Sequence, residues 1–480
     1  MFDVAIIGAG VIGGMIAREL SAYELNVCMI ESENDVGRGS SSANSAIVHA
    51  GFDAKPGTFK ARFNVEGSAM MEQVCKELGV KYKRNGSLVV GFGPEDRETL
   101  ETLLERGRIN GVEGLYIAEK EELHKMEPGL ADEADCALVA PTGAIICPYE
   151  LTFAAVGNAM DNGAELLLNF KVSAIGRQNA AKSSYFVVTA EDGRTVEAKN
   201  VVNAAGVYSD VIARLAGDAS FTVTPRRGEY MVLDKTSGNA CSHTIFRTPT
   251  KMGKGILITP TVDGNLLLGP TSVNISDKSD VSVTAEGLDK IISQVKQEMP
   301  GVNTGSVITS FCGLRAVGST GDFIINNPMP GFFNAAAIES PGLTSSPAIA
   351  RYMAGMIESA GVKLKKKENY IRTRRAYHWF RELDTEGCNK AIEKEPEYGH
   401  VICRCEKITE GEILNALRQN PKARDLDGIK MRTRAQMGRC QGGFCGPHIV
   451  RILAEALGVP FTEITKSGKG SYINVGKTKQ

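Results

Sequence analysis

Four cysteines near the C-terminus carry the strongest chemical signal in this sequence. Cys403 and Cys405 form a C-x-C pair in VICRCEKIT, and Cys440 and Cys445 form a C-x4-C pair in MGRCQGGFCGP. A single turn of chain between the two loops can bring four thiolates to one point. Structural zinc usually uses C-x2-C spacings, whereas a two-iron cluster needs two thiolates per iron and accepts other spacings. The spacing therefore favours an iron–sulfur cluster, with zinc and unliganded core thiols as the alternatives.

A second group of residues, near the N-terminus, indicates a dinucleotide. FDVAIIGAGVIGGMIAREL reads as a buried strand, then Gly8, Gly10 and Gly13 in G-x-G-x-x-G, then a helix, and the next strand ends at Glu31. Such glycines let the backbone approach a pyrophosphate at the helix N-terminus, and an acid about twenty residues further on can bind a ribose hydroxyl. Strand, turn, helix, strand and acid occur in the required order, which predicts a Rossmann-like nucleotide site.

Three further segments extend this site. NVVNAAGVYSD runs from a buried strand into Gly206, ESPGLTSSPAIARYMAGMI places a glycine turn before a helix, and GRGSSSANSAIVHAG is rich in serine. This set resembles the FAD-dependent oxidoreductases of the D-amino-acid-oxidase and glycerol-3-phosphate-dehydrogenase superfamily. The cysteine segments resemble the bacterioferritin-associated ferredoxin-like domain. The resemblance implies FAD, with Glu31 at its adenosine ribose, and a [2Fe–2S] cluster on the four cysteines. It also implies FAD contacts from Ser41, Ser42, Asn44, Ser45, Val172, Gly206, Gly313, Gly342, Leu343 and Thr344.

Four residues are candidates for substrate chemistry. Flavin oxidation of an alcohol needs a base for the hydroxyl proton and a group that holds the rest of the substrate. His49, in NSAIVHAG, matches a histidine pattern shared by glycerol-3-phosphate dehydrogenases and L-2-hydroxyglutarate oxidases, which implies a place beside the flavin. Arg315 aligns with an arginine that clamps the substrate phosphate, and Arg227 and Tyr230 in TPRRGEY are secondary candidates for the pocket lining. A structural histidine and a surface arginine are the alternatives.

The substrate signals point in two directions. Glycerol-3-phosphate dehydrogenases carry G-G-K where this chain has SPGL at 340–343, which is closer to the hydroxyglutarate branch. The appended cluster domain instead resembles that of the anaerobic glycerol-3-phosphate dehydrogenase subunit. We expect a flavin dehydrogenase for a small anionic secondary alcohol, sn-glycerol 3-phosphate first. An L-2-hydroxy acid, an amino or imino acid, and a non-catalytic electron-transfer subunit are the alternatives. Electrons are expected to pass through the cluster to a partner protein, a second flavoprotein or a ferredoxin-like subunit.

Length and composition fit a multidomain enzyme. A chain of 480 residues is too long for one ordinary core. The hydrophobic fraction of 42% is typical of a globular protein, and the net charge of −1 gives no reason to expect nucleic acid. No apolar stretch approaches the length of a membrane span, and a strand at residue 3 leaves no room for a signal peptide. We therefore expect a cytoplasmic protein, in keeping with its eleven cysteines.

The expected fold is α/β: a Rossmann-like FAD-binding domain, an antiparallel β substrate domain and a small helical iron–sulfur domain. GEYMVLD and GNLLLGP read as strands of the antiparallel sheet. Thr409 and Glu412 form the capping-box pattern of a helix start, and GPHIVRILAEALG reads as a second helix. The predicted boundaries are 1–80, 140–220 and 305–360 for the FAD-binding domain, 81–139 and 221–304 for the substrate domain, 361–398 for a basic linker, 399–458 for the cluster domain and 459–480 for a tail.

The basic linker allows two interpretations. The run KLKKKENYIRTRRAYHWFR, residues 363–381, contains eight lysines and arginines. Such a run is usually a solvated connector, and the alternative is a surface for an electron-accepting partner or an anionic membrane. Trp379 is expected to anchor the linker on the FAD-binding domain.

Overall fold

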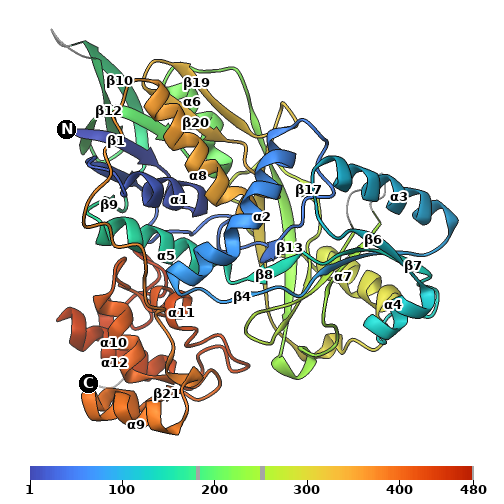
Figure 1. Ribbon diagram of the computed structural model, residues 1–480. Helices are drawn as coiled ribbons and strands as arrows, with labels where there is room; N and C mark the ends of the chain where they lie inside the picture. Colours follow the sequence, from blue (N-terminus) through green and yellow to red (C-terminus); the bar gives the residue numbers. More distant parts are fainter. Residues whose placement is uncertain (180–183, 249–254, 478–480) are drawn as a thin grey trace.

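Two large β-sheets organise most of the chain ahead of the cysteine loops (Figure 1). The computed structural model describes residues 1–179, 184–248 and 255–477, and within these ranges one sheet has eight strands and the other nine. The eight-stranded sheet contains β1 (Phe2–Ile7), β2 (Val27–Ile30), β9 (Glu165–Leu167), β10 (Val172–Asn179), β11 (Ser184–Ala190), β12 (Thr195–Asn203), β19 (Ile324–Met329) and β20 (Phe332–Ala336). The nine-stranded sheet contains β5 (Ser87–Gly91), β6 (Tyr116–Glu119), β7 (Cys136–Ala140), β13 (Val223–Leu233), β14 (Thr244–Arg247), β15 (Leu257–Pro260), β16 (Leu266–Gly269), β17 (Val273–Asn274) and β18 (Val307–Gly318).

Smaller elements complete the fold. A three-stranded sheet joins β3 (Ile47–Val48), β8 (Ala144–Ile146) and β4 (Tyr82–Lys83), and a two-stranded sheet joins β21 (Val401–Cys403) and β22 (Ile408–Thr409). The α-helices of the described residues are α1 (Val11–Leu20), α2 (Phe59–Leu78), α3 (Pro94–Ile109), α4 (Lys120–Met126), α5 (Pro148–Asp161), α6 (Ser209–Leu215), α7 (Ala285–Glu298), α8 (Gly342–Ser359), α9 (Thr385–Lys394), α10 (Glu410–Arg418), α11 (Leu426–Thr433) and α12 (Gly446–Leu457).

The eight-stranded sheet is covered on both faces near its centre, which explains why β2 and residues 4–7 of β1 are apolar throughout. β1 pairs in parallel with β2 and β12, and β12 pairs in parallel with β20. Side chains alternate between the faces of a strand. Val4 and Ile6 pack with α1, α5 and α8, whereas Ala5 and Ile7 pack toward β10, β11 and α6. The first turn of α1 therefore follows directly from a strand fixed in the middle of the eight-stranded sheet.

The nine-stranded sheet is built around one long antiparallel pair, β13 with β18. Their register runs from Val223 opposite Gly318 to Leu233 opposite Val307. GEYMVLD and GNLLLGP also pair antiparallel, with Met231 opposite Leu268, as predicted. The placement of β18 differs from the predicted domain boundary, because residues 305–360 were assigned to the FAD-binding domain and β18 pairs with the substrate sheet instead. The chain crosses back to the eight-stranded sheet only at β19.

The C-terminal segment forms a small helical unit beside α5 (Figure 1). The predicted capping box at the start of α10 is confirmed, because the Thr409 hydroxyl accepts the Glu412 N–H at 3.3 Å and the Glu412 carboxylate accepts the Thr409 N–H at 2.9 Å. The second predicted helix is α12, which begins directly after Cys445. Helix α11, which was not predicted, contributes Arg432 to the interface with the FAD-binding part of the chain. Its guanidinium donates to both oxygens of Asp35, at 2.7 and 2.8 Å.

The basic linker connects the domains through ion pairs, and the interpretation as a solvated connector is wrong for Arg374 and Arg381, although Arg372 and Arg375 are exposed. Arg374 is buried and pairs with Asp161 at 3.2 Å. Arg381 pairs with Asp263 at 2.6 Å and with Glu406 at 3.1 Å. Trp379 donates its backbone N–H to Glu412 of the cysteine-rich unit, so it anchors the linker there and not on the FAD-binding domain as expected.

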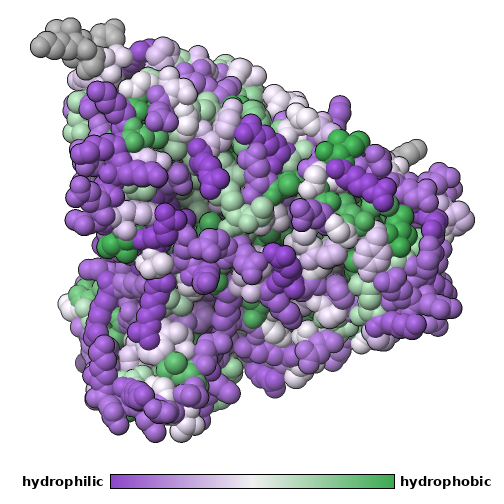
Figure 2. Space-filling view, viewed as in Figure 1, coloured by the Kyte–Doolittle hydropathy of each residue, from purple (hydrophilic) through white to green (hydrophobic). Residues whose placement is uncertain are grey.

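Hydrophilic residues cover most of the face shown in Figure 2, including the C-terminal unit. None of the helices within the described residues combines the length and apolar character needed to cross a bilayer.

Candidate active site and cluster site

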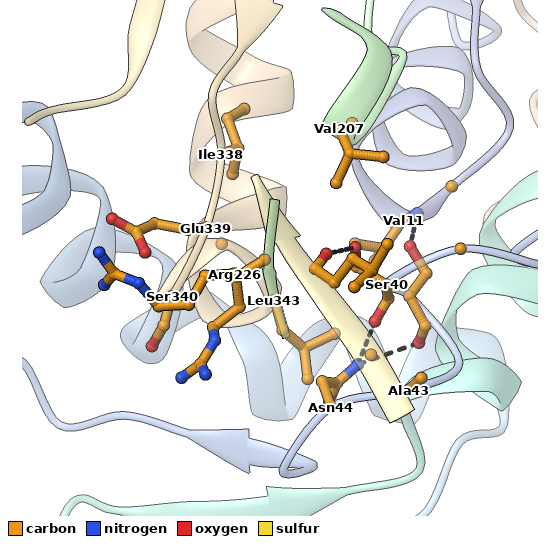
Figure 3. A pocket seen from close by; sticks show the side chains of 18 of the residues that line it. Val11, Ser40, Ala43, Asn44, Val207, Arg226, Ile338, Glu339, Ser340 and Leu343 are labelled. Carbon is orange, nitrogen blue, oxygen red and sulfur yellow. Dashed lines mark hydrogen bonds between the residues drawn. The ribbon is translucent and has the colours of Figure 1, made fainter. Parts of the chain in front are cut away.

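A cavity of about 1120 Å³ lies between the two large sheets. It is bounded by the glycine turn after β1, the serine-rich loop 37–46, strands β13 and β18, and the turn before α8. In Figure 3, Val11 and Ser40 lie toward one side of the cavity, and Arg226, Glu339 and Ser340 lie toward the other. The volume exceeds the usual range for one drug-sized ligand, so the cavity has room for a dinucleotide and a small substrate.

The glycine turn has no space for side chains. Gly8 has φ of +106°, and a Cβ there would collide with the carbonyl of Ala204. A Cβ on Gly13 would collide with the carbonyl of Gly8, so this third glycine serves the packing of α1 against β1. The first turn of α1 consequently opens onto the cavity through Gly10 and Val11, and a helix N-terminus with a bare backbone fits a pyrophosphate.

Glu31 lies at the end of β2 on the cavity wall, where an adenosine ribose would need an acceptor. Its carboxylate accepts the backbone N–H of Ala9 at 2.9 Å and that of Glu33 at 3.1 Å, which fixes its orientation. Burial raises the pKa of Glu31 above its usual value, although these N–H donors oppose the shift. The acid, the glycine turn and the helix N-terminus together fit FAD.

The serine-rich loop forms the next part of the wall, and Asn44 holds its shape. The Asn44 amide donates to the carbonyls of Ser40 and Ser41 at 3.0 and 3.1 Å, as the dashed lines in Figure 3 show. Ser41 accepts the N–H of Val11 at 2.9 Å, so the loop also caps α1. At its far end Ser45 lies 3.2 Å from the hydroxyl of Tyr230 on β13.

Most of the predicted FAD contacts line the cavity, and three do not. Those on the wall are Gly8, Gly10, Glu31, Ser41, Asn44, Ser45, Val172, Gly206, Gly313, Gly342 and Leu343. The other three are Gly13, Ser42 and Thr344. Ser42 turns back to the carbonyl of Gly37, and Thr344 accepts the backbone N–H of His49 at 2.9 Å. These three residues hold the lining residues in place and do not line the cavity themselves.

His49 lies on the cavity wall next to Ser340, which Figure 3 shows on the side opposite Val11. Its backbone is held on both sides, by Thr344 at the N–H and by the Asn64 amide at the carbonyl, 2.6 Å away. Its Nε2 is 3.3 Å from the Ser340 hydroxyl, and its ring packs against Phe246 with centroids 5.9 Å apart. The imidazole is thus placed on the wall with one nitrogen next to a hydroxyl that can orient it.

Tyr230 and Arg315 line the cavity, and Arg227 does not. Residues 226, 228 and 230 of β13 share one face of the strand, so Arg227 points to the other face. There it pairs with Asp280 at 3.2 Å. Arg226, which the sequence analysis did not select, takes the cavity position instead. The strand alternation relative to Tyr230 was the signal that could have identified it.

Arg226 and Arg315 occupy directly opposed positions on β13 and β18. Arg315 donates to the carbonyl of Thr271 at 2.6 Å, and its buried Nε has no hydrogen-bond partner. Among the described residues neither arginine forms an ion pair, and Glu339 on the same wall is paired with Lys60 at 2.8 Å. Burial, together with the positive charge of Arg226, lowers the pKa of Arg315. Two facing cations with one unsatisfied donor fit a small anion.

The four predicted cluster cysteines are arranged as two pairs. The sulfurs of Cys405 and Cys440 are 3.8 Å apart, and the Cys445 thiol donates to Cys403, which lowers the pKa of Cys403 to about 6. No group of three or more His, Cys, Asp or Glu side chains in the described parts of the chain is arranged to hold a single metal ion. Two thiol pairs instead match the two-thiolates-per-iron requirement of a [2Fe–2S] cluster.

A series of contacts connects the cavity wall with the segment that precedes Cys440. Ala46, on the wall, accepts the N–H of Ile146 at 3.0 Å. Three residues further on, the hydroxyl of Tyr149 contacts the sulfur of Met437 at 3.4 Å and the guanidinium of Arg434 at 2.7 Å. The two sites are therefore joined through the start of α5.

The cavity and the cysteine pairs together define a flavin-dependent oxidoreductase with a second redox centre. The model of the FAD dependent oxidoreductase family matches residues 3–356, and the chain belongs to this family. The BFD-like [2Fe-2S] binding domain matches residues 401–455, a range that includes all four cysteines. FAD and a [2Fe–2S] cluster are the cofactors of an enzyme of this composition.

Individual relatives cover either the whole chain or its flavin part. The chain is 48% identical over 481 residues to a glycerol 3-phosphate dehydrogenase of Caloramator mitchellensis, covering 100% of this chain and 99% of the relative. It is 32% identical to a glycerol 3-phosphate oxidase of Mycoplasma pneumoniae, covering 77% of this chain and 97% of the relative. The structure of dithionite-reduced L-alpha-glycerophosphate oxidase from Mycoplasma pneumoniae with FAD bound superposes with a TM-score of 0.74 at 31% identity, covering 78% of this chain and 98% of that one.

Proposed function

We propose that this enzyme is an FAD-dependent dehydrogenase of sn-glycerol 3-phosphate that passes its electrons through a [2Fe–2S] cluster to a partner protein. The observation that carries the substrate assignment is the opposed pair Arg226 and Arg315 at the cavity end that contains His49. The similarity to glycerol 3-phosphate enzymes over the full chain and over the flavin part supports the same substrate.

The arginine pair suits a phosphate better than a neutral group. Two like charges directly opposite each other on paired strands repel, and a doubly charged anion between them removes that repulsion. A guanidinium also presents several donors in a fixed plane that matches phosphate oxygens. Binding at this end would leave the rest of a three-carbon substrate within the cavity, near His49.

His49 is proposed as the base. When bound, FAD would accept a hydride, which is two electrons with one proton, from the substrate carbon. The hydroxyl on the same carbon must lose its proton, and a histidine is the side chain best suited to take it near neutral pH. Ser340 lies 3.3 Å from Nε2 and would orient the ring before the substrate hydroxyl replaces it as a partner.

The cysteine pairs give the electrons a route out of the enzyme. A [2Fe–2S] cluster transfers one electron at a time, so it suits a protein acceptor that carries single electrons. The contacts from Ala46 through Tyr149 to Met437 support transfer from the cavity toward the cluster within one chain.

Anaerobic rapid mixing tests this function directly. The oxidised holoenzyme is mixed with sn-glycerol 3-phosphate, L-2-hydroxyglutarate, glycerol or an amino acid, and the flavin absorbance is followed. We expect sn-glycerol 3-phosphate to bleach the flavin within the time of one turnover. Glycerol should not bleach it, because glycerol has no phosphate for the arginine pair to bind. Bleaching by L-2-hydroxyglutarate alone would assign the hydroxy-acid activity, and bleaching by none of them would identify an electron-transfer subunit.

A further inference from the structure

The cysteine loops reach the protein surface on one side only. Of the eleven cysteines, all within the described residues, Cys405 alone is exposed, and its partner Cys440 is half-buried. Cys403 and Cys445 are buried. A cluster held by the two pairs would therefore have its Cys405–Cys440 edge at the surface, which is the edge from which an electron can leave the molecule.

A large aromatic side chain stands beside this edge. Phe444 lies in the loop between Cys440 and Cys445, and 82% of its surface is exposed, more than that of any other aromatic residue in the described chain. Its backbone N–H donates to the sulfur of Cys440, so the position of the loop is tied to the cysteine site. Aromatic residues at protein–protein interfaces often act as the central anchor.

The exposed charged side chains of the two cysteine loops are all positive. Arg404, Lys407 and Arg439 are exposed on the two cysteine loops. Arg439 pairs with Asp234 at 3.0 Å, whereas Arg404 and Lys407 have no ion pair among the described residues. The one acid of these loops, Glu406, is 2% exposed and is held by Arg434 at 3.1 Å. No exposed carboxylate on these two loops neutralises the positive charges of Arg404 and Lys407.

We propose that the cysteine-loop surface, formed by Cys405, Phe444, Arg404 and Lys407, is the docking site of an acidic one-electron carrier protein. Phe444 supplies the apolar anchor, and Arg404 and Lys407 select a partner of opposite charge. One electron passes from the reduced cluster to the oxidised centre of the carrier, so two carriers are reduced for each substrate molecule oxidised. The proposal rests on the proposed function, because substrate oxidation supplies the electrons.

A protein partner fits this surface better than a membrane does. Stable membrane attachment needs a large apolar area or two separate anchoring signals. The cysteine-loop surface has one exposed phenylalanine and two cations without an ion pair among the described residues, and these lie on the two loops that carry the cysteines. This arrangement matches a small, short-lived electron-transfer interface, whose area is at the low end for protein complexes.

The test measures binding of the holoenzyme to an acidic plant-type ferredoxin and to an acidic flavodoxin by interferometry, at low and high salt. We expect Phe444→Ser to weaken binding at least tenfold at both salt concentrations. The double variant Arg404→Glu, Lys407→Glu should weaken it at low salt by a similar factor and remove most of the salt dependence. Cluster content and flavin bleaching should stay at the wild-type level in both variants.

Matched controls lie in the same C-terminal part of the chain. Phe461→Ser changes another exposed aromatic residue, and the double variant Lys422→Glu, Arg424→Glu changes two exposed cations outside the cysteine loops. Neither should affect carrier binding. Equal weakening by the controls, or no binding of either carrier to the wild-type enzyme, overturns the proposal.

Two further experiments distinguish a membrane from a protein partner, and the docking site from the proposed function. Binding to anionic phosphatidylserine vesicles that is lost in Phe444→Ser, without carrier binding, would assign the surface to a membrane and overturn the proposal. Chemical reduction with dithionite separates docking from the proposed function. If sn-glycerol 3-phosphate fails to bleach the flavin while the dithionite-reduced enzyme still binds and reduces the carrier through Phe444, the substrate assignment fails and the docking site stands.

Discussion

Arg226 and Arg315 face each other across the paired strands β13 and β18, and neither has a carboxylate partner among the described residues. A like-charge pair directly opposite in an antiparallel sheet destabilises the sheet. The neighbouring residues bring the strand pair close to the serine-rich loop: Gly228 and Gly313 also face each other, and a Cβ on Gly313 would collide with the carbonyl of Ala43. The strand pair thus combines two cations with a close approach to the serine-rich loop.

Arg226→Gln should raise the KM for sn-glycerol 3-phosphate by about tenfold to a hundredfold, the range for losing one charge-assisted contact to an anion. The maximal rate of flavin reduction should change much less, since the cation binds the substrate away from the reacting carbon. Stopped-flow traces at varied substrate concentration measure both values. Arg227→Gln is the matched control, because Arg227 points to the other face and pairs with Asp280. An equal effect of the two substitutions would contradict the assignment of Arg226.

His49→Gln should slow flavin reduction by roughly a hundredfold or more, the usual contribution of general-base catalysis, with a small effect on substrate binding. Glutamine keeps the size and a polar end of the side chain but cannot take the proton. Ser340→Ala should have a smaller effect, because Ser340 only orients the ring at 3.3 Å. The measurement is the limiting rate of bleaching at saturating substrate. A normal rate in His49→Gln would place the base elsewhere.

Cys440→Ser should remove the iron–sulfur cluster and leave FAD bound. The two sites are in separate parts of the chain, and loss of one thiolate leaves one iron with a single protein ligand. Iron and acid-labile sulfide should fall from about two each per chain, the content of a [2Fe–2S] cluster, to near zero. Substrate should still bleach the flavin, and reduction of a protein carrier should be lost. Cys388→Ser is the control, because Cys388 lies outside the cysteine pairs. Stoichiometric zinc in the wild-type protein would refute the cluster assignment.

Asp35→Asn should loosen the C-terminal unit from the FAD-binding part of the chain. Arg432 is fully buried, and both of its terminal nitrogens donate to Asp35. A buried guanidinium left without its carboxylate costs about 3–5 kcal/mol. Differential scanning calorimetry and limited proteolysis of the linker should show an earlier transition and faster cleavage. Glu455→Gln, which breaks the exposed pair with Arg451, should change stability by less than about 0.5 kcal/mol.

Ionisation of Glu298 should lower the free energy of unfolding as the pH rises from about 4.5 to 7. Burial raises the pKa of Glu298 to about 7, and Arg247, 4.0 Å away, offsets this only in part. The folded state therefore keeps the proton that the unfolded state loses above its ordinary pKa of 4.5, so the free energy of unfolding falls between about pH 4.5 and 7. Glu298→Gln should stabilise the protein by roughly 2–3 kcal/mol at pH 8 and have little effect at pH 4.5. Urea unfolding at both pH values measures this, and an equal shift at both would show that ionisation is not the cause.

The sequence by itself determined the features that depend on neighbouring residues. Gly8 and Gly10 predicted the turn before α1 because only a bare backbone can adopt that close approach. Thr409 and Glu412 predicted the start of α10 because a capping box satisfies the first free N–H groups of a helix locally. The cysteine spacing predicted two loops that meet, and the structure places their sulfurs in two pairs.

Only the tertiary structure decided which distant residues share a surface. Strand alternation puts Arg226 on the same face of β13 as Tyr230, but which of the two faces lines the cavity was decided by the packing of β13 and β18 against the serine-rich loop. The pairing of β18 with the substrate sheet and the burial of Arg432 against Asp35 likewise join segments far apart in the chain. Local propensity fixes a turn or a helix start, because the atoms involved are close in sequence. Contacts between distant segments are selected by the packing of the whole core, which no short stretch of sequence contains.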